Sequence, residues 1–128
     1  MPWADNNKGK FIANAFKNTT VRATSLAADT DVAVGSAVAN ATTTQTLIGM
    51  TISNITTGVI NVSVSLNNGS DQTWIVKDSP IPTGGSLITC GVDQKICLFH
   101  NGTNGDQIKV QSNTANSMHI IMSYLEST

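Results

Sequence analysis

The sequence has 128 residues, of which only 12% are charged, and a formal net charge of −1. A chain of this length usually forms one domain that buries roughly two-thirds of its unfolded surface. Without clustered Lys and Arg there is no electrostatic basis for binding nucleic acid, and no run of about 18 apolar residues is present to span a membrane. Asn, Thr, Ser and Gly replace the missing charges, a bias typical of strands joined by tight turns.

The first 18 residues differ from the rest. They contain Trp3, Phe11, Phe16 and three lysines, and the apolar residues from 11 to 16 are spaced as in one or two helical turns. So short a helix is marginal alone, and terminal aromatic residues usually pack on some other surface. We expect residues 1–18 to form an arm, lying across its own domain or on a neighbouring subunit, and residues 19–128 to form the domain. The arm lacks the apolar stretch of a secretory signal, which favours a protein kept in a cytoplasm or in a particle assembled there.

Two short strands are predicted next. Val21 alternates with polar neighbours, and Val32 with Val34 begins a second strand after an Asp-Thr-Asp turn. Residues 37–46 are polar and rich in Thr, so we expect a loop or an edge strand there.

A hairpin with one buried face follows, because apolar and polar residues alternate on both sides of the turn at residues 56–58. The Asn68-Gly69 step that ends its second strand is a strong signal for a further hairpin. Alternation places Ser63 and Ser65 outside and the following residues on the core face: Ile48, Met50, Ile52, Ile60, Val62, Val64 and Leu66.

The C-terminal half contains the densest series of strands. Trp74 and Val76 are predicted to face the core, and Pro80 and Pro82 make residues 79–85 a connection between two sheets. Later strands are expected at residues 86–90, 95–100, 106–112 and 118–125, with a hairpin turn at 91–94. About eight strands with turn signals every 8–12 residues predict an all-β protein, a single antiparallel β-sandwich or jelly-roll-like domain.

A second set of apolar residues is predicted to lie opposite the main core face. Such a patch marks an interaction surface, unless a thicker core or the arm covers it. With the aromatic residues of the arm, the predicted interface consists of Trp3, Phe11, Phe16, Ile75, Phe99, Ile121 and Leu125, and Cys97 lies on the same face.

No catalytic, cofactor or metal site is predicted. His100 lies three residues from Cys97, which places the two side chains on opposite faces of a strand and argues against a nucleophile–base pair. Asp29 and Asp31 lack the Gly and Glu of a calcium loop. In a 91–94 hairpin, Cys90 would be a diagonal neighbour of Cys97, too distant for a disulfide, so we expect two buried thiols.

One order of motifs resembles a known group of proteins. It is WIVKD at residues 74–78, PIP at 80–82, GSL at 85–87, GDQIKV at 105–110 and SYLE at 123–126. The layout is similar to that of small β-sandwich virion structural proteins of tailed bacteriophages, particularly phages of cyanobacteria and other aquatic hosts. The likeness covers roughly residues 45–126.

The resemblance implies a non-enzymatic virion component present in many copies and assembled in the host cytoplasm. The first expectation is a homo-oligomeric capsid decoration, or cement, protein that binds capsid subunits through its arm and sandwich surface. The alternative is a neck, tail or baseplate accessory protein that forms a ring. A receptor- or carbohydrate-binding module is a third possibility because jelly rolls also occur in lectins, although few aromatic residues are available to stack on sugars.

Overall fold

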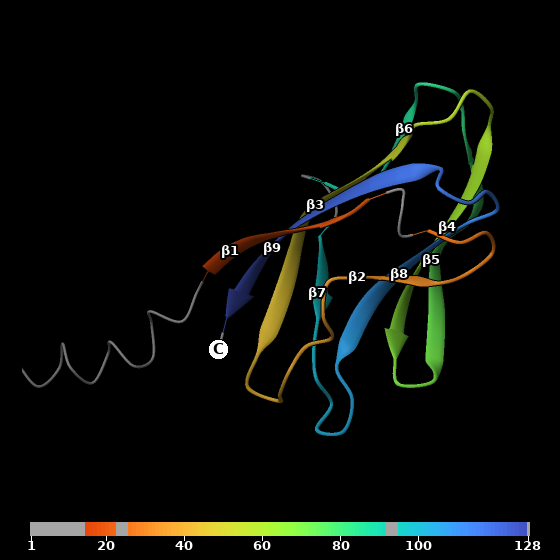
Figure 1. Cartoon of the computed structure of the whole chain (residues 1–128). Coiled ribbons are helices and arrows are strands. Elements are labelled where there is room, and N and C mark those ends of the chain that lie inside the picture. The colour runs from red at the N-terminus through yellow and green to blue at the C-terminus, as the bar shows by residue number, and fades with distance from the viewer. Residues whose placement is uncertain (1–14, 23–25, 92–94, 128) are drawn as a thin grey trace, which may run out of the picture.

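The computed structural model describes residues 15–22, 26–91 and 95–127, shown in colour in Figure 1. Every regular element in these residues is a β-strand, and no helix among them is long and apolar enough to cross a membrane. The strands are β1 (Ala15–Val21), β2 (Val32–Val34), β3 (Thr44–Asn54), β4 (Ile60–Asn68), β5 (Asp71–Ile81), β6 (Ser86–Cys90), β7 (Ile96–Leu98), β8 (Asp106–Ser112) and β9 (Met118–Ser127).

The strands form two antiparallel sheets. The first sheet has the order β1-β9-β3-β6, and β7 also pairs with β3; the second has the order β2-β8-β4-β5. Neighbouring strands are mostly distant in sequence, so the chain passes back and forth between the sheets, as Figure 1 shows. With β6 and β7 counted as one interrupted strand, this is the eight-stranded arrangement of a jelly roll. The predicted all-β sandwich is confirmed.

The core lies between the two sheets. Alternate residues of each strand point inward, and the core face predicted for β4 is confirmed because Ile60, Val62 and Val64 are at most 1% exposed. The predicted hairpin of β3 with β4 is wrong, because the two strands belong to different sheets and each pairs with other strands. β9 contributes Met118, Ile120 and Met122 from the opposite sheet, each at most 1% exposed. Burial of each such side chain contributes roughly 1.5–3 kcal/mol.

A β-bulge changes the predicted face of one residue in β3. Leu47 is opposite Tyr124 and Gly49 is opposite Ser123, so Ile48 is the extra residue that no β9 residue opposes. Leu47 therefore lies in the core at 1% exposure, as does Met50 at 2%. The prediction that Ile48 belongs to the core face is wrong.

Two irregularities in β5 reverse the faces predicted for Trp74 and Ile75. Val62 pairs with Ser79, yet Val64 pairs with Val76, so the two strands shift register. A second shift brings Trp74 opposite Ser65, on the outer face, where it is 39% exposed. Ile75 is half-buried against the core. The predictions that Trp74 faces inward and Ile75 outward are both wrong.

The first of these shifts is held by a specific contact. Asp78 adopts a positive φ of 51°, and its N–H donates a hydrogen bond to Ser63 Oγ at 2.9 Å. Asp tolerates this left-handed conformation better than most residues. β5 then continues through Pro80 to Ile81, so the predicted connection at 79–85 begins later than expected. β5 is an edge strand, where a proline removes no ladder hydrogen bond.

β6 and β7 do not form the predicted hairpin with each other. Both pair with β3, one after the other: Cys90 lies opposite Met50 and Cys97 opposite Thr46. Neither cysteine is in a disulfide. Cys90 is buried, but Cys97 is exposed, so the prediction of two buried thiols is wrong for Cys97.

The N-terminal part of the described chain is an ordered strand of the first sheet. β1 pairs with β9 along its whole length, from Ala15 opposite Glu126 to Val21 opposite Ile120. Residues 15–18 of the predicted arm therefore belong to β1, and Ala15 and Phe16 are not in a helical turn. Trp3 and Phe11 lie outside the described residues.

Candidate interaction surface

The outer face of the first sheet carries a row of apolar side chains across its strands. Thr51 of β3 lies opposite Ile121 on β9 and opposite Ile88 on β6, and Thr20 of β1 lies beyond Ile121. Directly opposite residues of antiparallel strands share a face. Ile88 is 70% exposed and Ile121 is 55% exposed, so this row presents aliphatic groups to the surroundings.

A second row crosses the same face nearer the C-terminal end of β9. Phe16 lies opposite Leu125, Leu125 opposite Thr46, and Thr46 opposite Cys97. Phe16 is 79% exposed, whereas Leu125 is half-buried. Phe99, two residues beyond Cys97, is 53% exposed. We call Phe16, Ile88, Phe99, Ile121 and Leu125 the apolar face.

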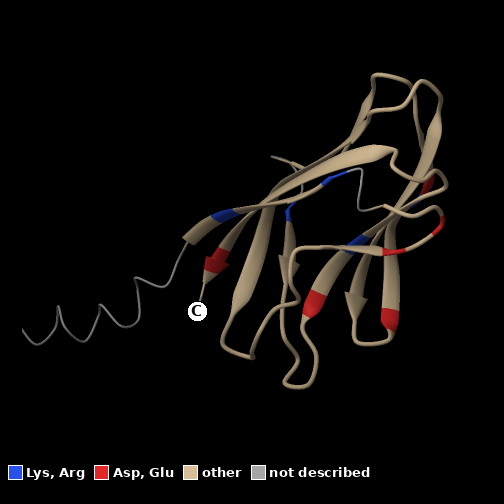
Figure 2. Cartoon of the chain, in the orientation of Figure 1, with Lys and Arg blue, Asp and Glu red and all other residues tan. Residues whose placement is uncertain are grey.

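Charge is scarce on the strands around this face. β3, β6 and β7 contain no Asp, Glu, Lys or Arg. β1 contains one such residue and β9 one, and both lie at the same end of the first sheet (Figure 2). These are Lys17 and Glu126, which form an ion pair with each other. Removing this face from water would leave no unpaired charge within its strands.

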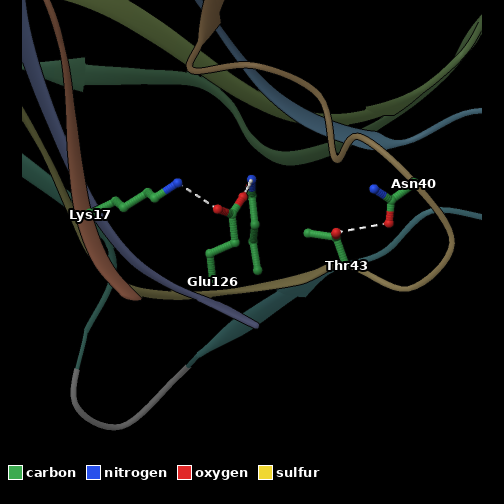
Figure 3. A network of polar contacts seen from close by, with 5 residues as sticks. Lys17, Asn40, Thr43 and Glu126 are labelled. Carbon is green, nitrogen blue, oxygen red and sulfur yellow. Dashed lines mark hydrogen bonds and ion pairs between the residues drawn. The ribbon is translucent and has the colours of Figure 1, made fainter. Parts of the chain in front are cut away.

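The Lys17–Glu126 ion pair links β1 to β9 near the N-terminal end of β1 and the C-terminal end of β9. Lys17 Nζ lies 2.6 Å from Glu126 Oε2, as Figure 3 shows, and Gln45 Nε2 of β3 donates to Glu126 Oε1 at 3.2 Å. The hydrogen bond from Lys17 followed by that from Gln45 lowers the pKa of Glu126 below its ordinary 4.5. The same contact raises the pKa of Lys17 above 10.5. Nearby, Thr43 Oγ1 donates to Asn40 Oδ1 at 2.9 Å, which orders the chain before β3 (Figure 3).

The outer face of the second sheet is different because its own side chains cover it. Ser65 is fully buried, and its Oγ accepts hydrogen bonds from Asn67 Nδ2 at 2.8 Å and Gln72 Nε2 at 2.9 Å. Gln72 Nε2 also donates to Asp31 Oδ2 at 3.1 Å. This face thus satisfies its polar groups internally.

Trp74 on the second sheet is also engaged. The Nζ atom of Lys77 lies 4.1 Å from the centroid of the Trp74 ring, within the range of a cation–π interaction. The Lys77 side chain therefore occupies one side of the ring, which a stacking ligand would need.

A hollow of about 170 Å³ opens beside the apolar face. Arg22 directly follows β1, and His119 precedes Ile120 in β9, so the two lie at the end of the β1–β9 ladder. The hollow is lined by Thr20, Val21, Arg22, His119, Ile120 and Ile121. It combines a cationic side chain with one of the exposed isoleucines.

Of the predicted interface residues, Phe16, Phe99, Ile121 and Leu125 come together on the first sheet. Ile75 does not join them because it packs against the core. Trp3 and Phe11 lie outside the described residues. Ile88 was missed because Leu87 and Ile88 are adjacent apolar residues, and alternation alone does not say which of the two faces outward. The role of these residues as an interface stays a prediction.

The structure shows no catalytic arrangement around His100 and no metal site among the described residues. His100 Nδ1 accepts a hydrogen bond from the Gly102 N–H at 3.0 Å in the turn before β8. Within residues 15–22, 26–91 and 95–127, no group of three or more His, Cys, Asp or Glu is placed to hold a metal ion.

No family model and no curated protein matches the sequence. Among solved structures, the chain is similar to one from the disulfide-linked pili of Bacillus endospore appendages, with a TM-score of 0.55 and 14% identity over 91% of this chain and 88% of that chain. Lower scores relate it to the Drosophila NLP-core, with TM-score 0.45 and 14% identity over 86% of this chain and 96% of the other. For a pentameric capsid protein from metagenomic phage sequences, the TM-score is 0.31 and the identity 12%, over 93% of this chain and 64% of that chain. At these identities the likeness is one of fold.

Proposed function

We propose that the protein is a non-enzymatic structural subunit of a phage particle, a decoration protein that binds the assembled head through residues 1–18 and the apolar face. The observation that carries this proposal is the outer face of the first sheet. It exposes Phe16, Ile88, Phe99 and Ile121, and its strands contain only two charged residues, which neutralise each other.

Contact with another protein explains such a surface. Exposed apolar residues are common singly, but a group on one face usually marks an interaction site. The core of a protein interface is typically aromatic and aliphatic and depleted of charge, which is the composition of this face. The second sheet lacks these properties because its side chains hydrogen-bond to one another.

Two comparisons support an assembly role. The sequence motifs between residues 74 and 126 resemble virion structural proteins, and jelly rolls are common in capsid proteins. The fold is also similar to a chain that assembles into pili. A carbohydrate-binding module is less well supported, because the half-exposed Trp74 already has Lys77 over its ring.

A ring-forming neck, tail or baseplate protein remains the second candidate. The apolar face on one side of a sandwich could equally contact a neighbour in a ring, so copy number separates the two roles. Quantitative mass spectrometry of purified particles gives the number of copies per particle. A decoration protein should be present in a number set by the capsid lattice, and a neck or tail protein in the few copies that form one ring. Absence from purified particles would overturn the virion proposal.

The decoration role has a direct binding test. Full-length protein is added to heads assembled without it, and bound protein is measured after sedimentation. The Ile121→Asp variant is expected to lose binding, whereas Val59→Asp, which changes an exposed side chain in the β3–β4 turn, should bind like the original chain. Equal binding by both variants would remove the apolar face from the proposal.

A further inference from the structure

The hollow at the end of the β1–β9 ladder contains a cationic side chain, that of Arg22. Among the residues that the structure describes, the side chains of Arg22 and His119 make no ion pair or hydrogen bond. A guanidinium offers five N–H donors arranged to match a carboxylate. The hollow is therefore built to accept an anionic group, with Ile121 as an apolar wall.

The other cations near the first sheet are not available in the same way. Lys17 is paired with Glu126, and Lys77 lies over Trp74 on the second sheet. Lys109 is in β8, opposite Ser65 of β4, and so belongs to the second sheet. Lys95, which directly precedes β7 of the first sheet, also interacts within the chain. Arg22, by contrast, borders the apolar face and has no counter-charge within the described residues.

The complementary charge is present on the other side of the sandwich. The acidic residues on the second sheet and in the loops that adjoin it are Asp29, Asp31, Asp71, Asp78 and Asp106 (Figure 2). Three of their side chains are engaged within the chain: Asp31 with Gln72, Asp78 with Ser63, and Asp106 with Asn68 and the Phe99 N–H.

The two remaining carboxylates, Asp29 and Asp71, make no side-chain hydrogen bond or ion pair with any described residue. Both are exposed at turns: Asp29 precedes β2, and Asp71 begins β5 directly after the Gly69-Ser70 turn. Gly69 has a φ of 60°, which gives this turn its tight form. A carboxylate at a turn can enter a hollow of about 170 Å³ without displacing a strand.

We propose that the Arg22–His119 hollow of one copy binds a carboxylate on the second-sheet side of another copy, supplied by Asp29 or Asp71. The hollow and the carboxylates lie on opposite sheets, so the contact joins two different surfaces. Such a heterologous contact builds a ring when its rotation closes and a filament when it does not. It also places the apolar face of the first copy, through Ile121, beside the second copy.

This inference goes beyond the proposed function, because it needs no phage particle and is tested on the purified chain. Self-association of the full-length protein is measured by analytical ultracentrifugation over a concentration series. The Arg22→Glu variant is expected to weaken association on the order of tenfold or more. Arg22→Lys retains a cation in the hollow and should weaken association less than Arg22→Glu.

Charge reversal identifies the acceptor. Asp29→Lys or Asp71→Lys, combined with Arg22→Glu, is expected to restore association for the residue that enters the hollow, because the pair is re-formed with its signs exchanged. Far-UV circular dichroism and thermal melting confirm that each variant is folded. The proposal would be overturned if the unmodified protein were monomeric, or if Arg22→Glu associated as strongly as the unmodified protein. It would also be overturned if neither double variant restored the association that Arg22→Glu loses. Absence of the protein from phage particles would not affect it.

Discussion

Ile88 and Ile121 lie on either side of Thr51, in one row across the outer face of the first sheet. They come from strands β6 and β9, which do not pair with each other, so β3 brings them together. Both are more than half exposed. The row is therefore an apolar surface created by strand order and not by neighbouring residues in the sequence.

Replacing Ile88 with Ser is expected to reduce binding to a partner surface without reducing stability. The side chain is 70% exposed, so its loss costs little folding free energy, about 0.5 kcal/mol or less. Val59→Ser is the matched control, because Val59 is 62% exposed but lies in the β3–β4 turn. Binding to heads or to other copies should fall for Ile88→Ser alone. A similar fall for Val59→Ser would indicate a general effect of surface hydrophobicity.

Asn54→Ala is expected to destabilise the fold by about 2 kcal/mol or more. The Asn54 Nδ2 donates to the carbonyl oxygens of Gly58, Ile81 and Pro82, and its Oδ1 accepts from the N–H and hydroxyl of Thr56. Asn54 is only 5% exposed, so the carbonyls left behind would lack replacement partners. Urea unfolding measures the loss. Asn54→Asp keeps the acceptor but not the donors, and stability near that of the original chain would show that the donors are dispensable.

Gly105→Ala is expected to cost about 1–3 kcal/mol. A Cβ at this position would overlap the carbonyl oxygen of Val38 and lie 2.8 Å from its carbonyl carbon. The Val38 N–H also donates to Asp106 O at 3.1 Å, so this segment has little freedom to move away. Gly58→Ala is the control, since a Cβ there meets no atom within 4 Å. Equal melting temperatures for the two variants would contradict the predicted clash.

The Lys17–Glu126 pair is expected to make stability depend on pH at both extremes. The folded pKa of Glu126 lies below 4.5, so its contribution is complete above the unfolded value and is lost as the pH falls through the lowered folded value. The folded pKa of Lys17 lies above 10.5, so its contribution is complete below that value and is lost as the pH rises through the raised one.

Thermal melting of the Glu126→Gln variant tests this. At neutral pH the variant should melt below the unmodified protein. The difference should disappear under acidic conditions, where the protonated Glu126 carboxyl is neutral like the Gln amide. A difference that persists unchanged as the pH falls through the lowered folded pKa of Glu126 would show that the ion pair is not its cause.

Cys97 should react with a thiol reagent in the folded protein, whereas Cys90 should react only on opening. Cys97 is exposed, but Cys90 is 3% exposed and its thiol donates to Leu47 O at 3.4 Å. The reaction rate of a buried thiol falls as the free energy of the local opening that exposes it rises. Cys97→Ser should abolish the fast phase. Equal rates for both thiols would contradict the placement of Cys90 in the core.

Alternation in the sequence predicted the strands whose register is regular. In β4, Ile60, Val62 and Val64 face the core as expected, because no residue interrupts the period of two. Ile121 and Phe99 were placed on the outer face for the same reason, and both are exposed. The jelly-roll class followed from the number of strands and the turns between them.

Errors occurred where one inserted residue reversed the faces of a strand. The bulge at Ile48 and the register shifts near Ile75 and Asp78 each add a residue that alternation cannot detect. The missing β6–β7 hairpin has another cause: both segments find a longer partner in β3, a pairing set by the whole sheet. The hollow at Arg22 and His119 was missed because it depends on where the β1–β9 ladder ends.

The edges of the two sheets determine how the molecule avoids uncontrolled strand addition. β2 has only three residues, β5 is bent by register shifts and carries Pro80, and the edge beside β3 is divided between β6 and β7. Such edges are poor templates for a further strand. Among the described strands, β1 alone offers a regular edge, from Ala15 to Val21. Addition of a further strand is therefore expected at β1 and not at the other edges of the described sheets.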